Sequence, residues 1–216
     1  MVSRLLAKLE QARRLVRLLA DAHRSVKDLD EVDSADGYFR SFGRHASGQH
    51  ASSALDIGCG SSPRNPFGAS SVFGVDIRAS DDANIRQADL SIEPIPFPDG
   101  HFDYITAFDF IEHVPRVTYL PERRFPFVML MDEIWRALKP GGIFFSRTPM
   151  YPFAEAFQDP THVNIITAQT FPAYFDDSSR LAKMYGFKGS FEIVAQARLG
   201  SHLVSVLRRN QNRLPS

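Results

Sequence analysis

Residues 53–60 read Ser-Ala-Leu-Asp-Ile-Gly-Cys-Gly, a short apolar run that ends in a turn with two glycines. The apolar run has the length and composition of a buried strand. Because glycine has no Cβ, a chain that turns at Gly58 and Gly60 can lie directly against a ligand. In open α/β sheets, ligands bind at the carboxyl ends of the strands, where this turn stands. The stretch therefore predicts an α/β fold with a small molecule bound at its first turn.

Similar apolar runs follow this turn along the chain, at residues 71–77, 84–90, 102–110 and 141–149. The connections between them are too long for hairpins, which indicates crossovers between parallel strands. Residues 120–138 have the spacing of a helix, and residues 191–200 and 201–210 alternate around a Gly-Ser turn like an antiparallel pair. We predict a Rossmann-like, doubly wound α/β sheet that is mostly parallel, with an antiparallel C-terminal strand and an N-terminal helix.

A chain of 216 residues is long enough for one such domain with additions. The sequence predicts a helical extension and linker over residues 1–50, the main domain over 51–210 and a short tail over 211–216. Within the main domain, residues 150–177 are rich in proline and aromatic residues and have no regular period. Long irregular segments of this kind are typical of active-site lids, so we expect a mobile lid there.

The N-terminal stretch predicts an amphipathic helix, because apolar residues recur at spacings of three, four or seven: Leu5, Leu9, Ala12, Val16, Leu19 and Val26. Residues 1–27 carry seven basic and two acidic side chains. A membrane-surface helix or an organelle presequence fits this pattern, and so does a helix that packs on the domain or on a second copy. We favour packing, and a homodimer through this helix is one form of it.

The composition excludes several classes of protein. Twenty-five basic residues balance twenty-five acidic ones, so no nucleic-acid partner is expected. No apolar run is long enough to span a membrane, and no secretory leader is evident. The single cysteine, Cys59, fits a reducing compartment. We therefore expect a cytoplasmic protein.

Acidic side chains follow four successive predicted strands, at Asp56, Asp76, Asp89 and Asp109. A carboxylate after the second strand can accept both hydroxyls of a ribose. Asp89 stands where it can accept a hydrogen bond from an adenine amine, with Leu90 packed on the ring. One such aspartate is more often a cap or a turn former, but four at one sheet edge indicate a ligand site. A dinucleotide-binding turn usually has a third glycine, and none follows Gly60. An NAD-type oxidoreductase is therefore the alternative and not the first choice.

The segments ALDIGCG, GVDI, QADL, FDYITAFDFIEHV and LKPGGIFFSRTP resemble, in order and spacing, the motifs of class I S-adenosylmethionine-dependent methyltransferases. The resemblance covers residues 55–149 and is nearest to the bacterial methyltransferase-11 and methyltransferase-23 types. It implies S-adenosylmethionine as cofactor, with the glycine turn on its carboxypropyl group, the second acid on ribose and the third on adenine. The cofactor-binding residues it implies are Asp56, Gly58, Cys59, Gly60, Asp76, Ile77, Asp89, Leu90, Phe108 and Asp109.

The acceptor side depends on two histidines, because methyl transfer to a hydroxyl needs a group that takes the proton. His162 lies in the predicted lid and is the first candidate for this base, although a backbone hydrogen bond is an equal explanation. His113 is the second candidate, but for this residue we favour a structural role at a helix start. Glu112, His113, Asp159 and His162 are of metal-ligand type, but no compact spacing such as H-x-x-x-H appears, so no metal site is predicted.

Taken together, the sequence predicts methyl transfer from S-adenosylmethionine to a hydroxyl of a small molecule or sugar. The alternatives are an NAD-type oxidoreductase and a non-catalytic module that only binds S-adenosylmethionine. The signature N/D-P-P-Y/F of base-methylating enzymes is absent after the fourth strand, where the chain reads DFIE.

Overall fold

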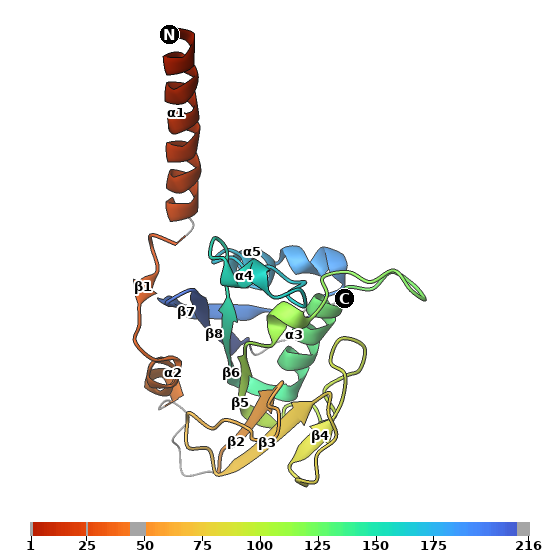
Figure 1. Ribbon diagram of the computed structural model, residues 1–216. Coiled ribbons are helices and arrows are strands. Elements are labelled where there is room, and N and C mark those ends of the chain that lie inside the picture. Colours follow the sequence, from red (N-terminus) through yellow and green to blue (C-terminus); the bar gives the residue numbers. More distant parts are fainter. Residues whose placement is uncertain (1, 25, 44–50, 211–216) are drawn as a thin grey trace.

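The computed structural model describes residues 2–24, 26–43 and 51–210, so the predicted tail at 211–216 lies outside the described residues. The described residues form an eight-stranded sheet in the order β1-β7-β8-β6-β5-β2-β3-β4 (Figure 1). The last strand, β8, is antiparallel to β6 and β7, and all other neighbours are parallel. The predicted α/β sheet with an antiparallel C-terminal strand is confirmed.

The strands are β1 (Asp30–Glu31), β2 (Ser53–Ile57), β3 (Ser71–Asp76), β4 (Ile85–Gln87), β5 (Phe102–Phe108), β6 (Leu138–Pro149), β7 (Phe191–Leu199) and β8 (His202–Arg209). The α-helices are α1 (Val2–Arg24), α2 (Ala35–Gly43), α3 (Pro126–Ala137), α4 (Glu155–Gln158) and α5 (Thr170–Tyr174). Two 3-10 helices, η2 (Ile111–His113) and η3 (Leu181–Tyr185), complete the described elements that matter here.

The sheet is covered on both faces, which explains the continuous apolar run of β2. One face packs against α2, where Phe39 is fully buried, and against Phe67, whose ring stacks on Tyr104 with centroids 4.4 Å apart. The other face packs against α3 and α5. Because β2 lies between β3 and β5, the ends of these three strands meet at one edge of the sheet.

The crossovers after β2, β3 and β4 differ from those of an ideal doubly wound sheet. None of the residues that the structure describes in these three connections is helical. After β2 the reason is local, because Pro63 and Pro66 both disfavour helix in the residue before them and lack an amide proton. The loops leave the carboxyl edge of β2 and β3 open, and this edge is where the predicted site stands.

Two elements differ from the sequence prediction. The helix expected from residue 120 begins at Pro126, because proline is favoured at the first helical position and the preceding residues pair as a short bridge between Thr118 and Arg124. The two-residue strand β1 was missed, because its Asp-Glu sequence has no apolar pattern. It forms by pairing with Ala197 and Arg198 of β7.

Helix α1 extends away from the sheet (Figure 1). Its side chains from Leu6 to Ala20 are exposed, including Leu9, Val16 and Leu19 with more than half of their surface accessible. The apolar face that the sequence predicts therefore has no contact with the main domain over these residues. No described helix is long and apolar enough to cross a membrane.

The segment predicted as a mobile lid is packed in its second half. Ile166 pairs with Met150, and Ile166, Phe171 and Phe175 are almost completely buried in the main core. Exposing one such side chain costs about 1.5–3 kcal/mol, so a motion of the whole segment that exposes all three would be strongly unfavourable. Mobility stays a prediction, and we expect it only before Val163, because the amides of Val163 and Asn164 donate to the Glu112 carbonyl.

Candidate functional site

A cavity of about 420 Å³ lies beyond the carboxyl ends of β2, β3 and β5, and we call it the glycine-turn cavity. Its volume falls in the range of about 300–1,000 Å³ that small-molecule sites occupy. Six residues that the sequence assigned to the cofactor line it: Gly58, Asp76, Ile77, Asp89, Leu90 and Asp109. The other lining residues are Val75, Arg78, Ala88, Ser91, Phe110, His113 and Val114.

The glycine turn requires glycine at Gly58 and Gly60. Gly58 has φ +71° and Gly60 has φ +63°, both in the left-handed region. A Cβ on Gly58 would lie 2.4 Å from the ring of Phe110, so the turn and this ring are in direct contact. The Gly58 amide donates to the Val75 carbonyl at 2.8 Å, which ties the turn to β3.

Asp56 is buried in β2, just before the glycine turn, and is not among the residues that line the cavity. Its carboxylate is 2% exposed and accepts hydrogen bonds from the Thr106 hydroxyl at 2.7 Å and the Arg64 amide at 2.9 Å. Burial raises the pKa of Asp56 to about 6 in spite of these two donors. This carboxylate therefore positions the chain that leaves the turn.

Cys59, Gly60 and Phe108 also lie next to the cavity and are not among its lining residues. Burial raises the pKa of the Cys59 thiol to about 11, with a contribution from Asp56, so this thiol is a poor nucleophile. The guanidinium of Arg64 lies over the Phe108 ring, 4.3 Å from its centroid.

Asp76 ends β3 with its carboxylate already engaged. It accepts hydrogen bonds from the Gly60 amide at 2.7 Å, from the Arg78 amide at 3.0 Å and from the Arg78 Nε at 2.9 Å. Burial alone would raise the pKa of Asp76, but the hydrogen bonds from Arg78 and Gly60 outweigh it and lower this pKa. A ribose at this position would replace the side chain of Arg78, which is largely exposed.

Asp89 and Asp109 occupy two further walls of the cavity. The Asp89 carboxylate accepts from the Ser91 amide at 3.0 Å, which is a local turn contact. Asp109 has φ +49°, an unusual conformation for a residue with a side chain, and its carboxylate pairs with Arg147. Its amide donates to the Arg147 carbonyl at 2.8 Å, so β6 fixes this sharp turn after β5.

Glu112, His113 and His162 form a second group beside the glycine-turn cavity, which we call the histidine cluster. One potential ligand atom from each lies within 4.8 Å of the other two. The two imidazole rings meet edge to face, with centroids 4.9 Å apart. His113 also lines the glycine-turn cavity, so the cluster and the cavity are adjacent.

The cluster joins two segments that are far apart in the sequence. Glu112 and His113 lie on η2, directly after β5, and His162 lies between α4 and α5. The amides of Val163 and Asn164 both donate to the Glu112 carbonyl at 2.9 Å, which fixes the second segment against the first. Both predicted catalytic histidines are therefore brought together, although nothing in their spacing indicated it.

Glu112 is a buried carboxylate with one satisfied oxygen. The side chain is 1% exposed, and its Oε2 accepts a hydrogen bond from the Thr148 hydroxyl at 2.8 Å. Its Oε1 is buried and has no hydrogen-bond partner among the described residues. Burial raises the pKa of Glu112 to about 7. A buried carboxylate oxygen without a donor is costly, and such groups are rare in folded proteins.

The hydrogen bonds of the two histidines define which nitrogen is free. The Nδ1 of His162 lies 3.0 Å from the Glu155 carbonyl, which can only accept, so Nδ1 carries the proton. The Thr161 hydroxyl donates to Asp159 at 2.6 Å, and His113 Nδ1 therefore donates to Thr161. In the neutral form, both histidines present an unprotonated Nε2.

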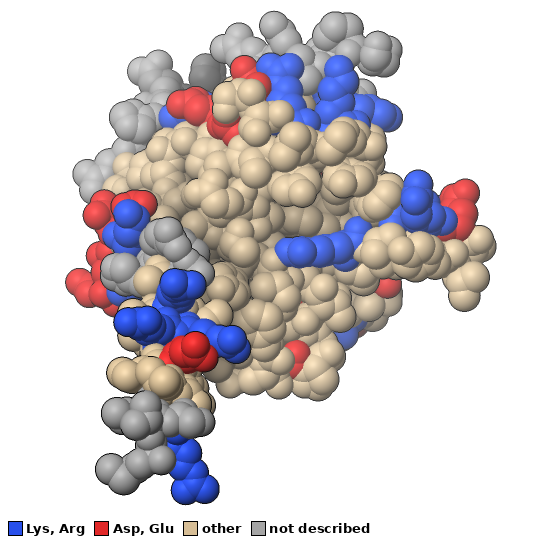
Figure 2. All heavy atoms as spheres, turned by 90° about the horizontal axis from the view of Figure 1, so that it is seen from above, with Lys and Arg blue, Asp and Glu red and all other residues tan. Residues whose placement is uncertain are grey.

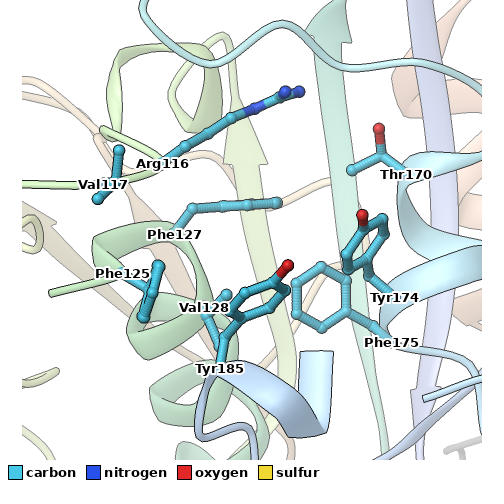
Figure 3. Close-up of a pocket in the computed structure, with 9 residues that line it drawn as sticks. All are labelled: Arg116, Val117, Phe125, Phe127, Val128, Thr170, Tyr174, Phe175 and Tyr185. Atoms are coloured by element: carbon cyan, nitrogen blue, oxygen red, sulfur yellow. The ribbon is translucent and has the colours of Figure 1, made fainter. Parts of the chain in front are cut away.

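A third feature is an aromatic cavity of about 310 Å³ (Figure 3). Its walls are Arg116, Val117, Phe125, Phe127, Val128, Thr170, Tyr174, Phe175 and Tyr185. Val114 lines the glycine-turn cavity and Arg116 lines the aromatic one, so their Cα atoms are at most about 7 Å apart. The Arg116 Nε also donates to Asn164 Oδ1 at 2.7 Å, next to the histidine cluster.

Sequence reasoning missed the arginines and the polar residues that complete the site. Arg78, Arg147 and Arg116 each hold a carboxylate or amide oxygen of the site, but as single basic residues they carry no pattern. Thr148 was missed for the same reason, because its contact with Glu112 depends on the pairing of β5 with β6.

The comparisons with known proteins agree with this geometry. A family described as a methyltransferase domain, of the methyltransferase-23 type, matches residues 5–185. A comparison with curated protein sequences gave no match.

Two solved structures illustrate the shared fold. A putative methyltransferase from Haloferax volcanii, solved with the activator Trm112, has a TM-score of 0.52 and 14% identity over 91% of this chain and 97% of that one. The [4+2]-cyclase SpnF has a TM-score of 0.51 and 14% identity over 82% and 81% of the two chains. At this identity the likeness shows the fold alone.

Proposed function

Because the chain belongs to the methyltransferase domain family and is an S-adenosylmethionine-dependent methyltransferase, we propose that it methylates a hydroxyl of a small molecule or sugar. The proposal concerns the acceptor, since the family establishes the donor. It rests on one observation above all: His162, whose Nδ1 is engaged by the Glu155 carbonyl, lies in a cluster that borders the glycine-turn cavity.

We propose that the donor occupies the glycine-turn cavity. Its ribose would bind Asp76 in place of Arg78, and its adenine would lie near Asp89 and Leu90, with Ile77 alongside. The amino-acid part would lie toward Asp109 and the glycine turn. The cavity's position at the carboxyl edge of a parallel sheet supports this arrangement.

The acceptor's hydroxyl must lose a proton as the methyl group is transferred. The free Nε2 of His162 suits this task, because a neutral imidazole accepts a proton near neutral pH. His113 would orient the acceptor between the cluster and the donor, since it belongs to both sites. Asp159 lies with its Oδ2 3.9 Å from the same Nε2 and would stabilise the imidazolium that forms.

We further propose that the aromatic cavity receives an apolar part of the acceptor. Five aromatic rings surround it, and Arg116 extends across one side (Figure 3). The face seen in Figure 2 is uncharged over most of its centre, with basic and acidic side chains at its margins. Such a face fits a neutral small molecule better than a polyanion.

The family match favours methyl transfer over the two alternatives that the sequence left open. An NAD-type oxidoreductase would bind a nicotinamide cofactor, and a non-catalytic module would bind the donor without turnover. Calorimetry with S-adenosylhomocysteine and with NAD separates the first from a methyltransferase, because only the correct ligand should bind. A screen of hydroxylated metabolites, in which mass spectrometry detects the gain of one methyl group, separates the second. Methylation only at nitrogen or carbon would contradict the hydroxyl proposal.

We propose that α1 forms a homodimer with α1 of a second copy. The support is the seven-residue repeat of Leu9, Ala12, Val16 and Leu19 on an exposed helix face. Light scattering should give twice the chain mass for the full chain and the single mass for Val16→Glu. A monomeric full chain would contradict this.

A cytoplasmic location stays a proposal on the basis of the single cysteine.

A further inference from the structure

When Glu112 is ionised and both imidazoles are neutral, the histidine cluster presents three electron-pair donors and no donor hydrogen between them. Glu112 contributes a buried carboxylate with an unpartnered oxygen, and each imidazole has its Nδ1 engaged by another partner, which leaves Nε2 as its free ring nitrogen. One water molecule has two hydrogens and satisfies at most two of these three atoms. A cation satisfies all three at once, and it also balances the charge of the buried carboxylate.

We infer that Glu112, His113 and His162 bind one divalent transition-metal cation, such as Zn²⁺ or Mn²⁺, beside the donor cavity. A carboxylate with two imidazoles is a ligand set for metals of this class. Three protein ligands also leave at least one position open, which is the arrangement of catalytic rather than structural metal sites. The inference rests on the proposed function for the identity of the acceptor, and it gives the cation the task that His162 has in the metal-free protein.

The surroundings of the two histidines support this assignment independently. A metal-bound histidine commonly donates its other ring nitrogen to a carbonyl or a carboxylate, which fixes the tautomer and the ring orientation. His162 donates its Nδ1 proton to the Glu155 carbonyl, and His113 donates its own to Thr161. Thr161 is in turn held by Asp159. Both imidazoles are thus oriented by partners outside the cluster.

The distances require a modest closure. Zinc binds nitrogen at about 2.0–2.1 Å, which places tetrahedral ligand atoms about 3.4 Å apart. The three atoms here lie within 4.8 Å of one another, so each separation must shorten by at most about 1.4 Å. His113 is exposed and can make this movement by rotation about its side-chain bonds, whereas Glu112 is fixed by Thr148.

The cation would bind the acceptor hydroxyl at its open position and lower the pKa of that hydroxyl. The O–H bond then breaks with the proton passing to water, the S–CH₃ bond of the donor breaks, and an O–CH₃ bond forms. S-adenosylhomocysteine is left without its positive charge. In this state the Nε2 lone pair of His162 belongs to the cation, so His162 acts as a base only in the metal-free protein.

The test uses the full chain without a histidine tag, treated with EDTA and dialysed before calorimetric titration with ZnCl₂. We expect one cation per chain, and binding weakened at least about tenfold in Glu112→Gln and in His162→Ala. His101→Asn is the matched control, because His101 lies just before β5 at the opposite edge of the sheet. Circular dichroism of each variant shows whether its fold is intact.

Two outcomes would overturn the inference. One is the absence of stoichiometric binding to the wild-type chain, and the other is binding that Glu112→Gln and His162→Ala leave unchanged. The visible absorption of bound Co²⁺ gives a second readout that does not depend on activity. Titration of the same metal-free protein with S-adenosylhomocysteine keeps the two proposals apart. Donor binding with no cation binding would leave the methyltransferase function standing and remove the metal.

Discussion

The donor half and the acceptor half of the site differ in how their carboxylates are satisfied. Asp56, Asp76 and Asp109 each accept hydrogen bonds from neighbours in the sequence or on the adjacent strand. Glu112 is as deeply buried as Asp56, yet one of its oxygens has no partner among the described residues. The donor half is complete without a ligand, and the acceptor half is not.

This difference follows from how the two halves are built. The donor half consists of turns at the ends of adjacent parallel strands, where backbone amides donate to Asp56 and Asp76 and a side chain of the neighbouring strand donates to Asp109. The acceptor half joins η2 to a segment about fifty residues later, and the hydrogen bonds between the two segments leave Oε1 of Glu112 without a partner among the described residues. We therefore interpret the donor half as a preformed pocket. The acceptor half is a group of side chains that requires a substrate or a cation.

The largest expected effect concerns the turn of the donor half. Gly58→Val should abolish measurable binding of S-adenosylhomocysteine, because the new side chain would displace Phe110 from the cavity wall and strain a left-handed turn. Gly68→Val is the matched control. Gly68 has φ +65° as well, but a Cβ there meets nothing within 4 Å. Calorimetry on both variants checks the prediction, and normal donor binding by Gly58→Val would exclude the turn as the donor site.

The second prediction concerns Asp56, the buried donor-half carboxylate whose oxygens are both paired. Its pKa in the folded protein is about 6, against about 3.8 when exposed. The unfolded chain ionises first, so stability from the protonated form is present below about pH 3.8 and lost as the pH rises toward 6. The loss is at most about 3 kcal/mol, since one pKa unit is worth about 1.4 kcal/mol.

Urea unfolding of wild type and Asp56→Asn between pH 4 and pH 7 measures this loss. The stability of wild type relative to the variant should fall over that range. Asp103→Asn gives the opposite sign in a lower pH window. Burial would raise the pKa of Asp103, but hydrogen bonds from Lys139 and Ser53 lower it, so wild type loses stability relative to this variant only as the pH falls below about 3.8, and the difference should stay nearly constant between pH 4 and pH 7. Parallel curves for Asp56→Asn and wild type would show that burial does not raise this pKa.

The third prediction tests the acceptor half. His162→Ala should lower turnover by about a hundredfold or more, because it removes either a base or a metal ligand. Donor affinity should change little, since His162 does not line the glycine-turn cavity. The measurement is steady-state kinetics with the identified acceptor, beside calorimetry with S-adenosylhomocysteine. Full activity in this variant would mean that His162 only bonds the Glu155 carbonyl.

The sequence predicts the donor half better than the acceptor half for a physical reason. Apolar runs and glycines are local signals, and they mark β2, β3, β5 and the turn at Gly58 without knowledge of the fold. The contact between His113 and His162 depends on long-range packing, which no spacing encodes. Likewise β1 exists only because β7 is beside it, and Arg78 was missed because a single exposed arginine carries no pattern.

The fourth prediction concerns the proposed ribose contact. Asp76→Ala should weaken binding of S-adenosylhomocysteine by about 2 kcal/mol, roughly thirtyfold, because two charge-assisted hydrogen bonds to the ribose are lost. Asp81→Ala is the control, since Asp81 is exposed in the loop after the same strand. Calorimetry that gives equal affinities for Asp76→Ala and wild type would remove Asp76 from the ribose site.

The smallest expected effect belongs to Arg78, the side chain that occupies Asp76 in the absence of a ligand. Its guanidinium is 2.9 Å from the Asp76 carboxylate, but the Arg78 side chain is 74% exposed, and exposed ion pairs contribute about 0–1 kcal/mol. A ribose that binds Asp76 must break this pair, so Arg78→Ala should leave donor affinity unchanged or raise it up to about fivefold. Calorimetry at low and at high salt measures the effect, which salt should diminish in wild type. A loss of affinity beyond about tenfold would mean that Arg78 contacts the donor itself, and the donor half would then be incomplete without its ligand, like the acceptor half.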